Sequence, residues 1–132
     1  MGLECEFSKN LMIWNRERTV NIMFDCYEEE EISEEQISAY EEFIENIEHN
    51  QKLAYQAFEK YCVENYSEDI PEDGFDNIYK YLLPDMIYVK RDYQDRKVIG
   101  FICRFKLDME NGLAVKFVDG AVEEVGPNQI VL

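Results

Sequence analysis

The sequence predicts an α+β fold in which one face of an antiparallel sheet of about five or six strands is covered by one long or two shorter helices. Apolar residues alternate with polar ones near the N-terminus and again in the last third of the chain, as is typical of strands. Between these two regions the apolar residues recur at helical spacing. The 132 residues are close to the commonest size of one domain, so we expect residues 1–132 to form a single domain.

The N-terminal region is expected to form a β-hairpin. Two strand-like segments, residues 11–14 and 19–27, flank the polar stretch Asn15-Arg16-Glu17-Arg18. Polar residues between two apolar runs are typical of a hairpin loop, so the sequence predicts a loop of about four residues.

The central region is expected to be helical from Ser33 onward. Ser33 is a favourable N-cap, and Gln36 stands at the position that closes a capping box. An apolar stripe then continues at helical spacing to about Tyr66. The polar residues 49–51 interrupt this stripe, so the sequence is compatible with one long helix or with two helices that meet near Asn50.

The last third is predicted to form a meander of antiparallel strands. A short helix over residues 75–82 precedes it, and Pro84 is expected to end that helix. The predicted strands span residues 86–93, 97–107, 113–118 and 121–125, with a first turn at Gln94-Asp95. Asn111-Gly112 and Asp119-Gly120 predict two further hairpin turns, because these residues tolerate the positive φ of primed turns.

The charge of the chain is strongly negative and unevenly distributed. Thirteen basic residues against 29 acidic ones give a net charge of −16. Residues 28–76 hold 17 acids and two lysines, a net charge of −15, so almost the whole field arises from the helical region. Such a field opposes binding to nucleic acid or to an anionic membrane, and we expect neither as a partner.

The acidic helical region has two interpretations. It is a solvated face that keeps the protein soluble, or it is a docking surface for a basic protein partner, because clustered acids accelerate association and select against wrong partners. On a continuous helix Glu41, Glu45 and Glu48 share one face. The residues predicted to bind the partner are Glu34, Glu35, Glu41, Glu45 and Glu48.

The sequence contains no motif that indicates catalysis, and we expect no enzyme activity, no cofactor and no metal ion. The one histidine, His49, lies four residues after Glu45, and these two side chains alone are too few ligands for a metal site. The cysteines form no CxxC pair and are expected to be buried and reduced; they are Cys5, Cys26, Cys62 and Cys103. The start of the chain lacks the features of a signal peptide, which predicts a cytoplasmic protein of unspecified oligomeric state.

A resemblance to a known family rests on residues 107–115, Leu-Asp-Met-Glu-Asn-Gly-Leu-Ala-Val, followed by Val125-Gly126. This run resembles the C-terminal signature of an uncharacterised bacterial domain family, in which a Trp-Asp-x-Glu-His-Gly-Leu-Gly-Val turn precedes a final Val-Gly. Here Leu107 replaces the Trp, Asn111 the His and Ala114 the Gly. The family's helical Gln, Asn and Tyr correspond to Gln36, Asn50 and Tyr61.

The resemblance implies a function as well as a turn. Members of this family look like small cytoplasmic proteins found beside polymorphic toxin genes, which implies an immunity role. The turn residues are Asp108, Glu110, Asn111 and Gly112. They have a purely structural interpretation, in which a hairpin turn fixes the register of its two strands.

Two functional hypotheses therefore come from the sequence. The first is a small acidic protein-binding module, of the immunity type, that neutralises a basic protein partner through its helical face. The alternative is a small ligand-binding domain or enzyme with a pocket near the turn from Asp108 to Glu110. The segregated charge favours the first hypothesis.

Overall fold

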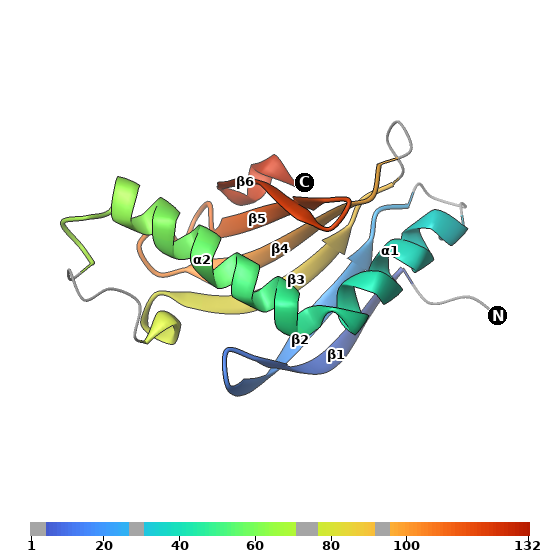
Figure 1. Ribbon diagram of the computed structural model, residues 1–132, viewed down its shortest axis with the longest axis horizontal. Coiled ribbons are helices and arrows are strands. Elements are labelled where there is room, and N and C mark those ends of the chain that lie inside the picture. The colour runs from blue at the N-terminus through green and yellow to red at the C-terminus, as the bar shows by residue number, and fades with distance from the viewer. Residues whose placement is uncertain (1–4, 27–30, 71–76, 92–95) are drawn as a thin grey trace.

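The computed structural model describes residues 5–26, 31–70, 77–91 and 96–132, which form two layers, one of strands and one of helices (Figure 1). The six strands are β1 (Glu6–Ile13), β2 (Arg16–Phe24), β3 (Leu82–Val89), β4 (Val98–Phe105), β5 (Leu113–Val118) and β6 (Ala121–Gly126). Two α-helices, α1 (Glu34–Glu45) and α2 (Ile47–Asn65), lie on one face of the sheet. Two 3₁₀ helices, η1 (Ile78–Lys80) and η2 (Asn128–Ile130), complete the elements.

The strands are ordered in the sheet as they are in the chain, β1-β2-β3-β4-β5-β6. Every neighbouring pair is antiparallel except β2 and β3, which are parallel. Parallel neighbours need a crossover connection, and α1 and α2 supply it. The α+β prediction is therefore confirmed, and the parallel pair is the feature that the hydrophobic pattern did not reveal.

The core lies between the sheet and the helices. Alternate residues of the central strands point toward α2, and residues paired on neighbouring strands form rows across the sheet. One such row consists of Ile22, Ile87, Phe101 and Val115. All four are buried, and so is Phe58 on the facing side of α2. Burying side chains of this size stabilises a fold by about 1.5–3 kcal/mol each, so this row anchors the helical layer to the sheet.

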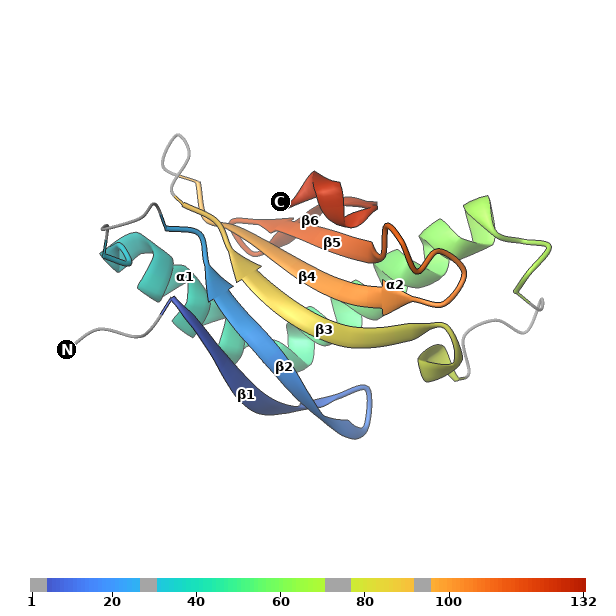
Figure 2. The same cartoon turned by 180° about the vertical axis from the view of Figure 1, so that it is seen from behind.

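The opposite face of the sheet is covered in part by the C-terminal segment. Figure 2 shows η2 on this face, while α1 and α2 lie behind the sheet. Ile102 and Ala114 pack there against Val131, and Met86 and Ile130 border this second, smaller cluster. The last residues of the chain therefore cover an apolar part of the outer face.

The hairpin between β1 and β2 differs from the sequence prediction. Ile13 pairs with Arg16, so the turn consists of two residues, Trp14 and Asn15, rather than of the four predicted residues. Both turn residues have positive φ, 49° and 66°, as a type I′ turn requires. The predicted loop length was wrong because positive φ is unfavourable for tryptophan, so the residue types give no reason to place a two-residue turn at Trp14.

The segment before β3 also differs from its prediction. A helix over residues 75–82 was expected, and the helical part that the structure describes is the 3₁₀ turn η1 alone. Pro84 lies within β3, beside the register shift that separates it from Met86, so it does not end a helix. Proline is tolerated in a strand at such a bulge. The predicted turn at Gln94-Asp95 lies outside the described residues.

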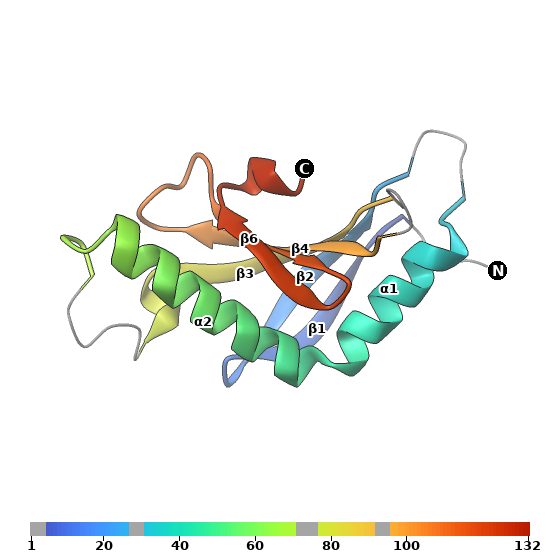
Figure 3. The same ribbon diagram turned by 45° about the horizontal axis from the view of Figure 1, so that its top comes forward.

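The helical region consists of two helices. Asn46 ends α1 and begins α2, and its ψ of 24° departs from helical geometry. The buried side chain of Asn50 donates a hydrogen bond of 3.0 Å from its Nδ2 to the carbonyl of Phe43, across the break. This bond satisfies one of the carbonyls that the end of α1 leaves unpaired. Figure 3 shows the two helices meeting at an angle.

The cysteines agree with the prediction only in part. The four thiols are free; Cys62 and Cys103 are buried and Cys26 is half-buried. Cys5 is exposed, which contradicts its expected burial, because it lies at the open end of the edge strand β1. Among the described residues, no helix has the length and the apolar composition that crossing a membrane requires.

Candidate functional site

The first candidate site is the exposed side of α1. The helix begins as predicted: Ser33 Oγ accepts a hydrogen bond from the Gln36 amide N–H, and Gln36 Oε1 accepts one from the Ser33 amide N–H. Gln36 is buried and also donates to the carbonyls of Asp25 and Val89, at 2.9 and 3.3 Å. A single glutamine therefore ties the start of α1 to the ends of β2 and β3.

The glutamates of α1 lie on one side of the helix. At 100° per residue they fall within an arc of about 120°, opposite the side that buries Ala39 and Phe43. We call four of them, all exposed, the α1 acidic surface: Glu34, Glu35, Glu41 and Glu45. The fifth, Glu42, pairs with the Lys97 ammonium at 2.9 Å.

The two ends of α1 differ in how well they tolerate these acids. Glu34 and Glu35 lie in the first turn, where the helix dipole stabilises negative charge. Glu45 lies in the last turn, which contains no basic residue, and a negative charge there costs about 0.3–1 kcal/mol. Glu41 and Glu45 are spaced i, i+4, which adds a repulsion of about 0.2–0.5 kcal/mol. Helix stability therefore does not explain the acids at the C-terminal end.

The break at Asn46 corrects the predicted continuous face. Glu41 and Glu45 belong to α1, whereas Glu48 lies in the first turn of α2 and lines a different part of the molecule. Because His49 also lies beyond the break, Glu45 and His49 do not share one helix. Within the described ranges, no three or more His, Cys, Asp or Glu side chains gather as a metal site.

The turn between β4 and β5 is held by its own side chains. Asp108 accepts hydrogen bonds from the Nδ2 of Asn111, at 3.2 and 3.0 Å, and its carbonyl accepts the Gly112 amide N–H at 2.9 Å. Gly112 has a φ of 65°, whereas Asn111 is not among the positive-φ residues, so the predicted two-residue primed turn is wrong here. Glu110 is exposed and points to no described partner.

The turn packs against the C-terminal segment. The amide N–H of Asn128 donates to the carbonyl of Asn111 at 3.0 Å, and a Cβ on Gly112 would lie 2.4 Å from the Asn128 side chain. The geometry therefore supports the structural interpretation of Asp108, Asn111 and Gly112. The two cavities described below are lined by other residues, so neither of them is the pocket that the sequence suggested at Asp108 and Glu110.

The second candidate site is a groove that sequence reasoning missed. It has a volume of about 770 Å³ and lies where the β1–β2 hairpin, the first half of α2 and η1 come together. Its residues come from three separate parts of the chain, at positions 12–16, 47–56 and 77–79, and no motif links them. The single tryptophan of the chain, Trp14, is the one sequence signal in the groove.

Aromatic rings form much of this groove. The ring of Trp14 meets the rings of Tyr55 and Tyr79 edge to face, with centroids 6.2 and 5.9 Å apart. The Tyr79 hydroxyl donates to the carbonyl of Ile13, and the guanidinium of Arg16 lies 4.6 Å from the centroid of the Tyr79 ring. The Tyr79 hydroxyl is protonated at neutral pH and acts as a donor, and burial raises its pKa further above its ordinary value.

A smaller cavity of about 220 Å³ lies at the α1–α2 corner, against β4 and β5. Glu42, His49 and Lys97 line it, together with Asp119 at the β5–β6 turn. Lys97 is already engaged by Glu42, and the Lys97 amide N–H donates to Asp119 Oδ1 at 2.9 Å. The polar groups that line this cavity therefore hold the helical layer to the end of the sheet.

Comparisons with known proteins give one finding. A family model described as Domain of unknown function (DUF6985) matches residues 3–132, nearly the whole chain. Neither the comparison with curated proteins nor that with solved structures gave a match. The matched length includes the capped start of α1, the α1–α2 corner and the turn at Asp108. In the structure, Gln36 and Asn50 hold elements together, and Tyr61 packs half-buried beside Tyr66.

Proposed function

Because the chain belongs to the DUF6985 family, we propose a function from its own residues: it is a protein-binding module that docks a basic protein through the α1 acidic surface. The observation that carries this proposal is the end of α1, where Glu41 and Glu45 are exposed and repel each other, and where Glu45 also opposes the helix dipole. A cationic partner removes both penalties at once.

Charge pairing within the molecule supports this proposal. Of the five glutamates of α1, Glu42 alone forms an ion pair with a described residue. In contrast, Arg96, Arg104 and Lys116 on the sheet are each paired with an acid. α1 therefore contributes five acids and no basic residue, and four of these acids have no counter-charge among the described residues. Such a field accelerates the encounter with a basic partner and disfavours an acidic one.

The proposal extends to the biological setting that the turn at Asp108 implies. We propose that the protein acts in the cytoplasm of a bacterium as an immunity-type protein, and that it neutralises a basic toxin by occupying its surface. In this proposal the chain performs no catalysis and needs no cofactor, because complementary charge and shape provide the inhibition. The competing interpretation of α1 as a solubility feature predicts no such partner.

The test is a measurement of association rate against salt concentration. The partner is obtained by affinity purification from the native host, and its binding to the wild type and to Glu41→Lys/Glu45→Lys is followed by stopped flow. We expect the wild-type on-rate to fall by about tenfold or more as the screening length shrinks from about 30 to 8 Å. The on-rate of the variant should be lower and should depend less on salt.

The matched control is Glu17→Lys/Glu124→Lys, which changes the net charge equally at exposed acids outside the helical layer. If the control slows association as much as the α1 variant does, total charge and not location governs binding, and the docking proposal is wrong. A partner that is itself acidic leads to the same conclusion.

A further inference from the structure

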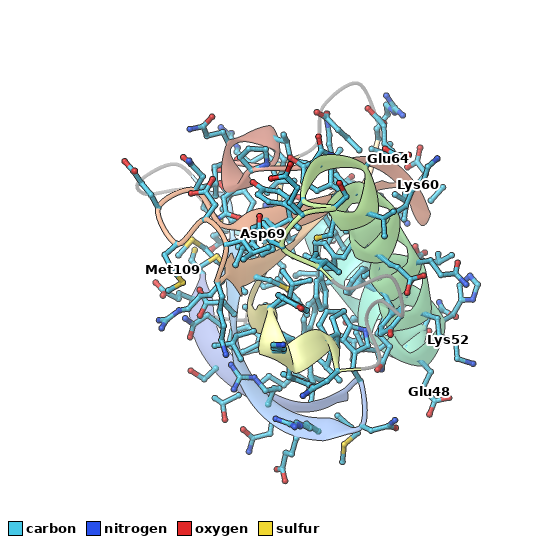
Figure 4. All side chains as sticks on the ribbon, turned by 90° about the vertical axis from the view of Figure 1, so that its left-hand side faces the viewer. Glu48, Lys52, Lys60, Glu64, Asp69 and Met109 are labelled. Carbon is cyan, nitrogen blue, oxygen red and sulfur yellow. The ribbon has the colours of Figure 1, made fainter. Side chains whose placement is uncertain are left out.

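The groove beside Trp14 has the construction of a ligand site, and it is separate from the α1 acidic surface. Figure 4 shows two of its charged side chains, Glu48 and Lys52, next to each other at the N-terminal end of α2, with Lys60 and Glu64 further along the helix. Arg16, at the start of β2, lines the same groove. Its volume of about 770 Å³ is within the range of small-molecule sites.

One wall of the groove contains a strained residue that hydrogen bonds hold in place. Trp14 has a φ of 49°, a conformation that costs a bulky residue about 1–3 kcal/mol and that persists only where the surroundings impose it. Gln51 imposes it here. Its Oε1 accepts the Trp14 amide N–H at 2.7 Å, its carbonyl accepts the indole Nε1–H at 2.9 Å, and its Nε2 donates to the Met12 carbonyl at 3.1 Å.

Strain of this kind clusters at binding sites, where it holds a side chain in a preformed position. The hairpin itself does not require a tryptophan, because asparagine or glycine fits the same turn position without strain. The Trp14 ring packs against the buried rings of Phe58 and Phe101, with centroids 6.1 and 5.8 Å apart, and it also lines the groove.

The charges of the groove indicate the kind of ligand. Arg16 and Lys52 are exposed cations that form no ion pair with a described residue, and Glu48 is the one acid among the described residues that line the groove. The charge of these described lining residues is therefore positive, in a protein whose net charge is −16. Arg16 already occupies one face of the Tyr79 ring, so a cationic ligand would meet repulsion there.

We propose that this groove binds a small anion that carries a flat ring. The ring packs against Trp14 and Tyr55, and the negative group lies between Arg16 and Lys52. Exposed carboxamides at the groove, those of Asn15 and Gln56, supply further donors. This site is independent of the docking surface, since the two share no residue.

The test uses the single tryptophan as its reporter. Because Trp14 is the one tryptophan of the chain, its fluorescence, excited where tyrosine does not absorb, reports occupancy of the groove directly. The probes are phenyl phosphate and benzoate, which combine a ring with an anion, and phenol and inorganic phosphate, which each lack one half. We expect at least one ring-bearing anion to give a saturable change, with an affinity about tenfold or more above those of phenol and phosphate.

Variants distinguish the groove from non-specific binding. Arg16→Gln and Lys52→Gln should each weaken binding of the ring-bearing anion by about tenfold. The control variants Lys60→Gln and Lys106→Gln remove exposed cations that do not line the groove, and they should leave the affinity unchanged. Calorimetry provides a second measurement that does not depend on fluorescence.

Three results would overturn the proposal. In the first, neither phenyl phosphate nor benzoate gives a saturable signal by fluorescence or calorimetry up to about 10 mM. In the second, inorganic phosphate binds as tightly as phenyl phosphate, which indicates adventitious anion binding only. In the third, Lys60→Gln weakens binding as much as Lys52→Gln does, which indicates a general effect of charge.

Discussion

At the scale of single residues, the turn after β4 depends on the absence of one side chain. Gly112 has a positive φ, which favours glycine, and the Asn128 side chain packs so closely against it that no Cβ would fit. Gly120, in the β5–β6 turn, also has positive φ, but an added Cβ there would meet no atom within 4 Å. The two glycines therefore separate backbone strain from crowding.

We predict that Gly112→Ala destabilises the fold more than Gly120→Ala. Strain alone should cost Gly120→Ala about 1–2 kcal/mol, whereas Gly112→Ala adds the displacement of the Asn128 side chain. Urea unfolding of both variants measures the difference in the free energy of unfolding. Equal losses of unfolding free energy in the two variants would mean that the Asn128 side chain moves aside at no cost and does not restrain the turn.

Residues also show what the sequence predicts and what it does not. Asp119-Gly120 was predicted as a primed turn and is one, because both residue types favour positive φ. Trp14-Asn15 forms the same kind of turn and was missed, because three hydrogen bonds with Gln51 impose it from 37 or more positions away in the sequence. A local pattern cannot report a conformation that distant residues enforce.

At the scale of elements, the start of α1 is the best-specified local structure in the chain. Ser33 and Gln36 exchange hydrogen bonds of 3.1 Å as the capping box predicts. Gln36 then reaches β2 and β3, a contact that no periodicity reveals. The helix break at Asn46 was open in the sequence because Asn50 is an ordinary polar residue in a helix until its partner, the Phe43 carbonyl, is known.

We predict that Ser33→Ala lowers the free energy of unfolding by about 1 kcal/mol, because the first turn of α1 loses a side-chain acceptor. Gln36→Ala should cost more, since it also removes the donor to the carbonyls of Asp25 and Val89. Thermal or urea unfolding checks the order. Ser67→Ala, at an exposed serine after α2, is the control and should be neutral; a loss equal to that of Ser33→Ala would contradict the capping role.

At the scale of the whole molecule, the two proposed binding surfaces have opposite charge: the α1 acidic surface is negative, and the described residues of the groove carry more positive than negative charge. The charge map of the sequence located the first of them, because acids can be counted along a helix without knowing the fold. The groove required the structure, since a hairpin tip, a helix and a 3₁₀ turn meet only after β2 and β3 pair in parallel. The sequence therefore predicts where the negative charge of this molecule lies, whereas the groove can be recognised only in the folded structure.

Buried thiol and phenol groups should make the stability of the fold depend on pH in the alkaline range. Burial raises the pKa of the Cys62 thiol from 9.0 to about 12, and it raises the pKa values of the Cys103 thiol and the Tyr79 hydroxyl in the same direction. These groups keep their protons in the folded state at a pH at which the unfolded chain has lost them. Their contribution to stability is complete below about pH 9 and is lost as the pH rises toward the folded-state values.

We expect the free energy of unfolding to be steady between about pH 7 and 8.5 and to fall above pH 9, by about 1.4 kcal/mol per pH unit for each proton that the unfolded state releases. Urea titrations at pH 7 to 11 measure this slope. Cys62→Ala should be less stable at pH 7 because it leaves a cavity, yet its slope above pH 9 should be shallower by about one proton. A slope identical to that of the wild type would show that Cys62 ionises in the folded protein, and that the core beneath α2 admits a charge.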